Sequence, residues 1–120
     1  MTKYLFSAGA FSVAALFAGV AQAAAPVMLV DTQGMTLYTF DKDAAGSGKS
    51  VCNGPCAQLW PPVMAAADAK AEGDMSIVVR DDGSRQWAYK GKPVYLYKPD
   101  EKAGDVKGDN FKNVWHIIAP

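Results

Sequence analysis

The feature of this sequence that most constrains its fold is an internal duplication. A pattern starts at Gly34 with an apolar residue three positions later, then a tyrosine, a second aromatic residue and an aspartate, and it recurs 57 positions further on from Gly91. Its other members are Leu37, Tyr38, Phe40 and Asp43 in the first copy and Val94, Tyr95, Tyr97 and Asp100 in the second. Such a repeat indicates one supersecondary unit that occurs twice. We therefore predict two related units, at about residues 27–62 and 84–118.

The N-terminal segment has the pattern of a secretory signal. Lys3 precedes an apolar, uncharged run, and Ala21-Gln22-Ala23 matches the small residues that signal peptidase requires. The run is shorter than a membrane-spanning helix needs. We expect a signal peptide over residues 1–23, cleaved after about Ala23, and a single secreted or periplasmic domain over residues 24–120. No cysteine stands directly after the apolar run, so we expect no lipid anchor and no stable membrane insertion after cleavage.

The charge balance excludes one class of partner. The chain has 12 basic and 12 acidic residues, and the basic residues form no cluster. Binding to nucleic acid or to an anionic membrane requires clustered positive charge. The expected partner is therefore an envelope protein or a small ligand, and not a nucleic acid.

Short apolar runs separated by turn-forming residues predict antiparallel strands. Asp31 to Gly34 and Asp81-Asp82-Gly83 are the turn signals of two hairpins. Residues 52–60 can hold one or two helical turns before Pro61, whereas the alanine-rich residues 63–74 fit either a short helix or an irregular connection. The predicted fold is mainly β, a small antiparallel domain made of two related hairpin-containing repeats with one short helix. The expected strands are residues 27–30, 35–40, 76–80, 85–89, 93–97 and 114–118.

Two segments of the duplication resemble a known family. Residues 38–43 and 95–100 both match Tyr-x-(Phe/Trp/Tyr)-x-x-Asp, and a Cys-Asn-Gly-Pro-Cys segment is followed by Trp60-Pro-Pro. Together with the closing Trp115-His116, these motifs resemble a bacterial family of predicted lipoproteins, also described as a secreted repeat of unknown function. The resemblance implies a secreted repeat protein and brings no established activity. This chain differs from many relatives because it lacks the cysteine to which a lipid is attached.

Cys52 and Cys56 are the only cysteines. An even pair in an oxidising compartment predicts a disulfide, and the turn-forming residues between them bring the two sulfurs closer. The spacing excludes haem attachment and a thioredoxin site, and a single histidine excludes a blue-copper site. A zinc site would need both cysteines, His116 and a carboxylate, which nothing in the pattern motivates. We therefore expect no metal and no cofactor.

The two aromatic residues of each motif copy lie on one face of a strand. In one interpretation they anchor a thin core, and the aspartates Asp43 and Asp100 accept backbone N–H groups that fix the following loops. In the other they line a groove that stacks on a sugar ring or a flat cofactor. That groove would consist of Tyr38, Tyr95, Tyr97 and Trp87. The candidate site residues are Tyr38, Phe40, Asp43, Trp60, Trp87, Tyr95, Tyr97, Asp100 and Trp115.

Three functions from different classes fit this sequence. No nucleophile motif with a base and an orienting partner is present, which favours a periplasmic, non-enzymatic binding or structural module. The alternative is a periplasmic redox or metal-handling protein that acts through Cys52 and Cys56. A third hypothesis is an envelope enzyme that uses His116 with an aspartate.

Overall fold

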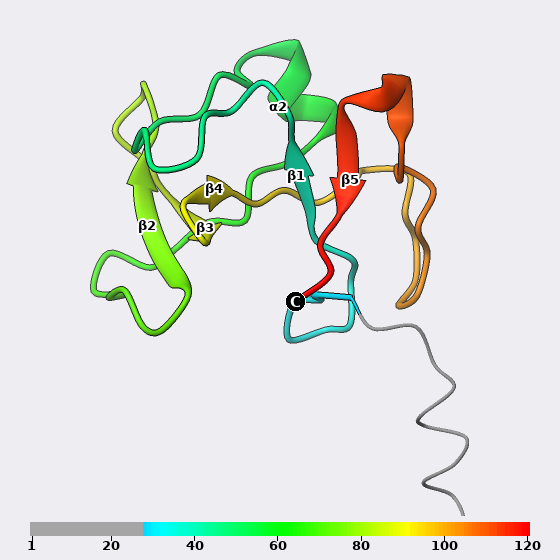
Figure 1. Ribbon diagram of the computed structural model, residues 1–120, viewed down its shortest axis with the longest axis horizontal. Coiled ribbons are helices and arrows are strands. Elements are labelled where there is room, and N and C mark those ends of the chain that lie inside the picture. The colour runs from blue at the N-terminus through cyan, green and yellow to red at the C-terminus, as the bar shows by residue number, and fades with distance from the viewer. Residues whose placement is uncertain (1–27) are drawn as a thin grey trace, which may run out of the picture.

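The computed structural model describes residues 28–120, so the signal sequence predicted for residues 1–23 lies outside the described part. Strands β1 (Tyr38–Phe40) and β5 (Trp115–Ile117) form one antiparallel sheet. Strands β2 (Met75–Val79), β3 (Arg85–Tyr89) and β4 (Lys92–Pro93) form a second. The helical segments are α2 (Pro55–Leu59) and the 3₁₀ turn η3 (Phe111–Asn113). The prediction of a mainly antiparallel β fold with one short helix is confirmed (Figure 1).

The first predicted hairpin forms as a short bridge. Val30 pairs with Thr36, and the Asp31 carboxylate accepts the N–H groups of Gln33 and Met35 at 2.8 and 2.9 Å. Gly34 closes this turn with a φ of 83°, a left-handed conformation that favours glycine. The turn therefore follows from local sequence alone.

One expected strand differs in the structure, and one open alternative is decided. The strand predicted for residues 93–97 is regular only at Lys92–Pro93, because Tyr95 leaves that sheet and makes bridges to both Tyr38 and Pro62. The alanine-rich residues 63–74 form no helix. Instead, the Arg85 guanidinium donates hydrogen bonds to backbone carbonyls in this segment, so an irregular connection wins.

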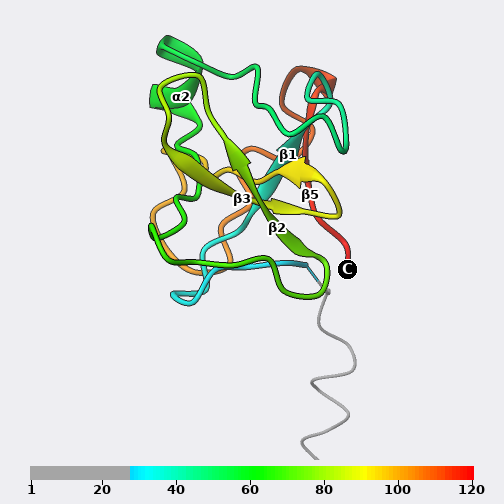
Figure 2. The same ribbon diagram turned by 90° about the vertical axis from the view of Figure 1, so that its left-hand side faces the viewer.

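The two repeats are interlocked through their backbones. Tyr38 and Tyr95 exchange both hydrogen bonds, with N–O distances of 2.8 and 2.9 Å. On the first side, β1 pairs with β5, which belongs to the second repeat. On the second side, the amides of Leu96 and Lys98 donate to the carbonyls of Pro61 and Leu59, which belong to the first repeat. Each tyrosine strand therefore pairs with the tryptophan segment of the other repeat, and β1 and β5 lie side by side at the centre of both views (Figures 1 and 2).

The core is a stack of four aromatic rings drawn alternately from the two repeats. Its central contact is between Trp60 and Trp115, whose ring centroids lie 3.8 Å apart with planes 2° from parallel. Phe40 stacks on Trp115 at 4.2 Å, and Tyr97 stacks on Trp60 at 4.1 Å. All four rings are buried. Every stacking contact thus joins one repeat to the other.

A second, aliphatic cluster repeats this symmetry. Leu37 and Val94, which occupy the same position in the two copies, are buried there with Ile118. Val63 and Trp87 pack against them as partly buried residues. Trp87 is therefore separated from the aromatic stack.

We predict that Trp60→Ala and Trp115→Ala each lower the free energy of unfolding by about 3–5 kcal/mol, the usual cost of removing a buried large aromatic ring. Each substitution removes the central contact of the stack, so the two costs are expected to be similar. Trp87→Ala, at a partly exposed ring outside the stack, is the control and is expected to cost less. Urea unfolding followed by circular dichroism measures all three, and a wild-type midpoint in either core variant would contradict the assignment.

Candidate functional site

The structure brings eight of the nine predicted site residues together and leaves Trp87 apart. Tyr38 and Tyr95 have no exposed surface, and Tyr97 is buried in the same cluster. Trp87 belongs to the aliphatic cluster. The predicted groove of these four rings is therefore wrong, because the three tyrosines are buried in contacts between the repeats and the partly exposed Trp87 lies in another cluster.

The motif aspartates bind the motif tyrosines in a crossed arrangement. The Tyr38 hydroxyl donates to Asp100 Oδ2 at 2.6 Å, and the Tyr95 hydroxyl donates to Asp43 Oδ2 at 2.5 Å. The other oxygen of each carboxylate accepts a loop amide, from Val51 at 2.7 Å for Asp43 and from residue 107 at 3.0 Å for Asp100. The expectation that these aspartates fix their loops is confirmed. Each carboxylate also ties its loop to the other repeat.

Both hydroxyls have strongly perturbed acidities. Burial raises the pKa of Tyr38 well above its ordinary value, and the hydrogen bond to the Asp100 carboxylate raises it further. Burial likewise raises the pKa of Tyr95, followed by its hydrogen bond to Asp43. A phenolate beside a carboxylate in a buried site would be doubly unfavourable. These tyrosines therefore act as neutral donors at every physiological pH.

Arg80 breaks the symmetry between the two crossed pairs. Its side chain is 7% exposed and donates to Ser50 Oγ at 3.0 Å and to Gln86 Oε1 at 2.8 Å. The Ser50 hydroxyl lies 2.6 Å from the Tyr95 hydroxyl, whose own hydrogen goes to Asp43. A chain of hydrogen bonds thus runs from a buried cation to a buried carboxylate, and each bond polarises the next. Sequence reasoning missed Arg80, because a single arginine at the end of a strand carries no local signal.

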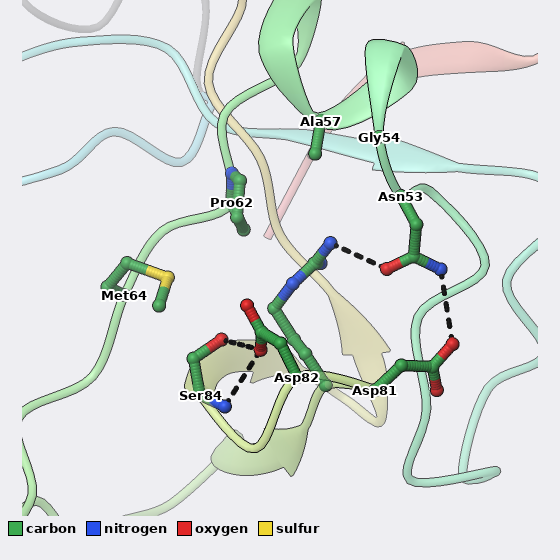
Figure 3. Close-up of a pocket in the computed structure, with 9 residues that line it drawn as sticks. Asn53, Gly54, Ala57, Pro62, Met64, Asp81, Asp82 and Ser84 are labelled. Atoms are coloured by element: carbon green, nitrogen blue, oxygen red, sulfur yellow. Dashed lines mark hydrogen bonds between the residues drawn. The ribbon is translucent and has the colours of Figure 1, made fainter.

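A cleft of about 510 Å³ opens next to this arginine (Figure 3). Asn53 accepts a hydrogen bond from Arg80 at 3.0 Å, and its amide nitrogen donates to Asp81 at 3.5 Å. Asp82 accepts from both the backbone and the hydroxyl of Ser84, and these bonds lower the pKa of its carboxyl. The polar groups at this cleft are therefore already bound to one another.

A second groove, mostly apolar, lies where the two repeats meet. Its volume is about 470 Å³, and it runs between α2 and η3, which occupy corresponding places in the two repeats. Figures 1 and 2 both place α2 and the orange-red turn before β5 at the same end of the molecule. The two tryptophans of the stack form its base, and Leu59, 37% exposed, forms part of its wall. The groove is lined by Phe40, Lys42, Pro55, Cys56, Leu59, Trp60, Phe111, Lys112, Val114 and Trp115.

Charge and backbone strain mark one side of this junction groove. Among residues 28–120, Lys42 and Lys112 are the only charged residues that line it. Asn110, Lys112 and Asn113 have φ values of 62°, 51° and 61°, in the left-handed region that residues other than glycine rarely adopt. Strained backbone persists where surrounding structure holds it, and it is concentrated at binding and catalytic sites. The Lys112 ammonium lies 5.5 Å from the centre of the Phe111 ring.

The predicted disulfide between Cys52 and Cys56 is confirmed, with Cα atoms 5.2 Å apart. Cys52 is completely buried in the aromatic cluster, and the partly buried Cys56 packs against it. The bond fixes the start of α2 and thereby one wall of the junction groove.

His116 points away from the core, as its place beside the buried Trp115 predicts. Its Nε2 lies 2.9 Å from Asp41 Oδ2 and its Nδ1 lies 3.1 Å from Asn110 Oδ1. These groups are partly exposed, and the contact between His116 and Asp41 links β5 to the residue that follows β1. Among residues 28–120, no three histidine, cysteine or acidic side chains come together as a set of metal ligands.

Comparison with known proteins identifies the class of protein. The model of a family described as a secreted repeat of unknown function matches this chain twice, over residues 21–64 and 76–119. The chain belongs to this family of secreted repeats. The two matched segments correspond to the two copies of the duplication in the sequence. Neither curated proteins nor solved structures gave a match. No helix in the part of the chain that the structure describes could cross a bilayer.

The raised tyrosine pKa values predict a loss of stability at alkaline pH. A pKa that is higher in the folded state stabilises the fold fully below the unfolded value, near 10, and this stabilisation is lost as the pH rises above it. Each buried tyrosine then lowers the free energy of unfolding by about 1.4 kcal/mol per pH unit. Tyr38→Phe removes one of these two contributions, so its stability should fall less steeply above pH 10. Urea unfolding across this range tests the slope, with Tyr89→Phe as the control; equal slopes in wild type and Tyr38→Phe would refute the assignment.

A further prediction concerns the disulfide. Replacement of both cysteines by alanine is expected to lower the free energy of unfolding by about 2 kcal/mol, the chain-entropy value for so short a loop. In the folded protein the bond should resist millimolar dithiothreitol, because Cys52 is buried and Cys56 only partly exposed. Alkylation and mass spectrometry with and without urea measure this. Rapid reduction without unfolding would instead favour a redox role.

Proposed function

We propose that this chain is a non-enzymatic binding module of the periplasm and that it binds its ligand in the junction groove between α2 and η3. The observation that carries the proposal is the composition of this groove: within the described part of the chain, an apolar wall and base with two lysines as the only charged residues. Ligand sites are typically apolar hollows with a few polar groups that fix orientation. The periplasmic location follows from the predicted signal sequence.

The chemistry of the groove favours a small apolar molecule with a negative charge. Trp60 and Trp115 stack face to face, so their ring edges, and not their faces, are turned toward a ligand. Leu59, Val114 and Phe111 supply the remaining apolar surface. Lys42 and Lys112 then provide an attractive field for an anion. This argument favours an apolar anion over the sugar ring considered from the sequence.

The structural support for binding is separate from the support for stability. The motif tyrosines and aspartates are buried and hold the repeats together. Leu59 and the two lysines line the groove but do not belong to the buried core cluster. The redox alternative through Cys52 and Cys56 stays a prediction, which the reduction experiment addresses.

The test uses two probes that share the same rings. 8-Anilinonaphthalene-1-sulfonate carries a negative charge, and N-phenyl-1-naphthylamine lacks it. We expect the anionic probe to bind the mature chain more tightly, with a change in tryptophan fluorescence because the groove lies over Trp60 and Trp115. Reversal of both charges in Lys42→Glu/Lys112→Glu should abolish the preference for the anionic probe.

Matched variants separate this site from general surface binding. Leu59→Asp places a negative charge in the groove wall at a partly exposed position. Val79→Asp places a negative charge at an exposed position of β2 outside the groove. The first should weaken probe binding at least tenfold and the second should leave it unchanged, while both retain the wild-type circular dichroism spectrum. Equal effects of the two substitutions, or equal affinity for the two probes, would overturn the proposal.

A further inference from the structure

We propose that a second copy of this chain is a partner that the fold is built to accept, through exchange of repeats between two molecules. In the exchanged dimer, residues 28–65 of one copy pack with residues 75–120 of the other. The inference rests on the topology of the repeats and does not depend on whether the junction groove binds a ligand.

The core contacts are the ones that such an exchange preserves. The stack alternates between repeats at each of its three contacts, and the Tyr38–Asp100 and Tyr95–Asp43 hydrogen bonds both cross from one repeat to the other. The pairing of β1 with β5 crosses as well. One molecule is therefore already arranged like a dimer of two fused units. Two molecules can form the same contacts twice, and only the segment that joins the repeats changes conformation.

The joining segment has the character of a hinge. Residues 66–74 contain no helix or strand and are mostly exposed. The Arg85 side chain holds the segment in its closed path, with one nitrogen donating to the carbonyls of Ala66 and Ala67 at 2.6 Å each and the other donating to Ala69 at 2.8 Å. In the monomer this clamp joins the hinge to β3 of the same chain, so a hinge that leaves this path loses it.

The length of the hinge sets the balance between the two states. A flexible connection of this length gives the two repeats an effective concentration in the millimolar range, which favours the monomer at ordinary protein concentrations. If the hinge is too short for the two repeats of one chain to pack on each other, the monomer loses this advantage. The core is then completed by exchange of repeats with a second chain. The exchanged dimer would carry two junction grooves, each with α2 from one copy and η3 from the other.

The first experiment changes the length of the hinge in the mature chain, and the deletion also removes the carbonyls that Arg85 binds. Deletion of residues 66–70 should give a dimer by light scattering after gel filtration, with the near-ultraviolet circular dichroism of the stacked tryptophans unchanged. Insertion of a Gly/Ser segment of equal length after Lys70 is the matched control and should leave a monomer. A shortened chain that folds as a monomer, stays unfolded at high concentration, or dimerises with altered aromatic spectra would overturn the proposal.

The second experiment weakens the clamp at constant length. Arg85→Ala should raise the dimerisation constant on the order of tenfold, because the monomer loses the bonds that hold its hinge closed. Lys70→Ala removes one positive charge from the same hinge without removing the clamp and should have no effect. Equal dimer fractions in the Arg85→Ala and Lys70→Ala variants would count against the proposed hinge. Neither measurement uses a ligand, so failure here leaves the proposed binding function to its own test.

Discussion

The rest of this structure depends on the antiparallel contact between Tyr38 and Tyr95, where the two repeats exchange both backbone hydrogen bonds. Because alternate side chains of a strand share a face, the aromatic residues two positions later are directed to the same side as these tyrosines. Each then meets the tryptophan of the other repeat, and Trp60 and Trp115 stack on each other between them. A short chain that can bury only a thin core gains most from such large rings.

This aromatic core imposes a condition on the polar groups that it buries. A carboxylate out of contact with water is costly unless hydrogen bonds satisfy it, and both motif aspartates meet this condition with a loop amide and a tyrosine hydroxyl. On one side alone, Arg80 extends the arrangement through Ser50. The two repeats therefore contribute the same arrangement of aromatic rings. Only the Tyr95–Asp43 pair, however, is linked to a buried arginine. This difference comes from β2 and its following turn, which supply Arg80 and have no counterpart among residues 28–120.

Of the two interpretations of the aromatic motif, the structure supports the one in which its rings anchor the core. The motif rings and aspartates are core, as the anchoring interpretation expects, and Trp87 lies in another cluster, so no groove of Tyr38, Tyr95, Tyr97 and Trp87 exists. An apolar groove is nevertheless present beside that core. Its walls come from α2 and η3, and although these segments occupy corresponding places in the two repeats, no sequence pattern predicts that they face each other across a groove. Hydrophobic patterning identifies which residues avoid water but does not specify which surfaces stay open once the core is filled.

The sequence by itself determined the duplication, the turns, most strands, the short helix and the disulfide. These features depend on the conformational preferences of a few neighbouring residues, such as Asp31 and Gly34 in the first turn, or on the compartment that a signal sequence implies. Only the tertiary structure decided that the repeats pair crosswise. Pairing within a repeat and pairing between repeats place the same residue types opposite each other, so the pattern at an offset of 57 is compatible with both. The choice is made by the packing of Trp60 on Trp115 and by the two crossed tyrosine–aspartate bonds, which are long-range contacts that no local preference encodes.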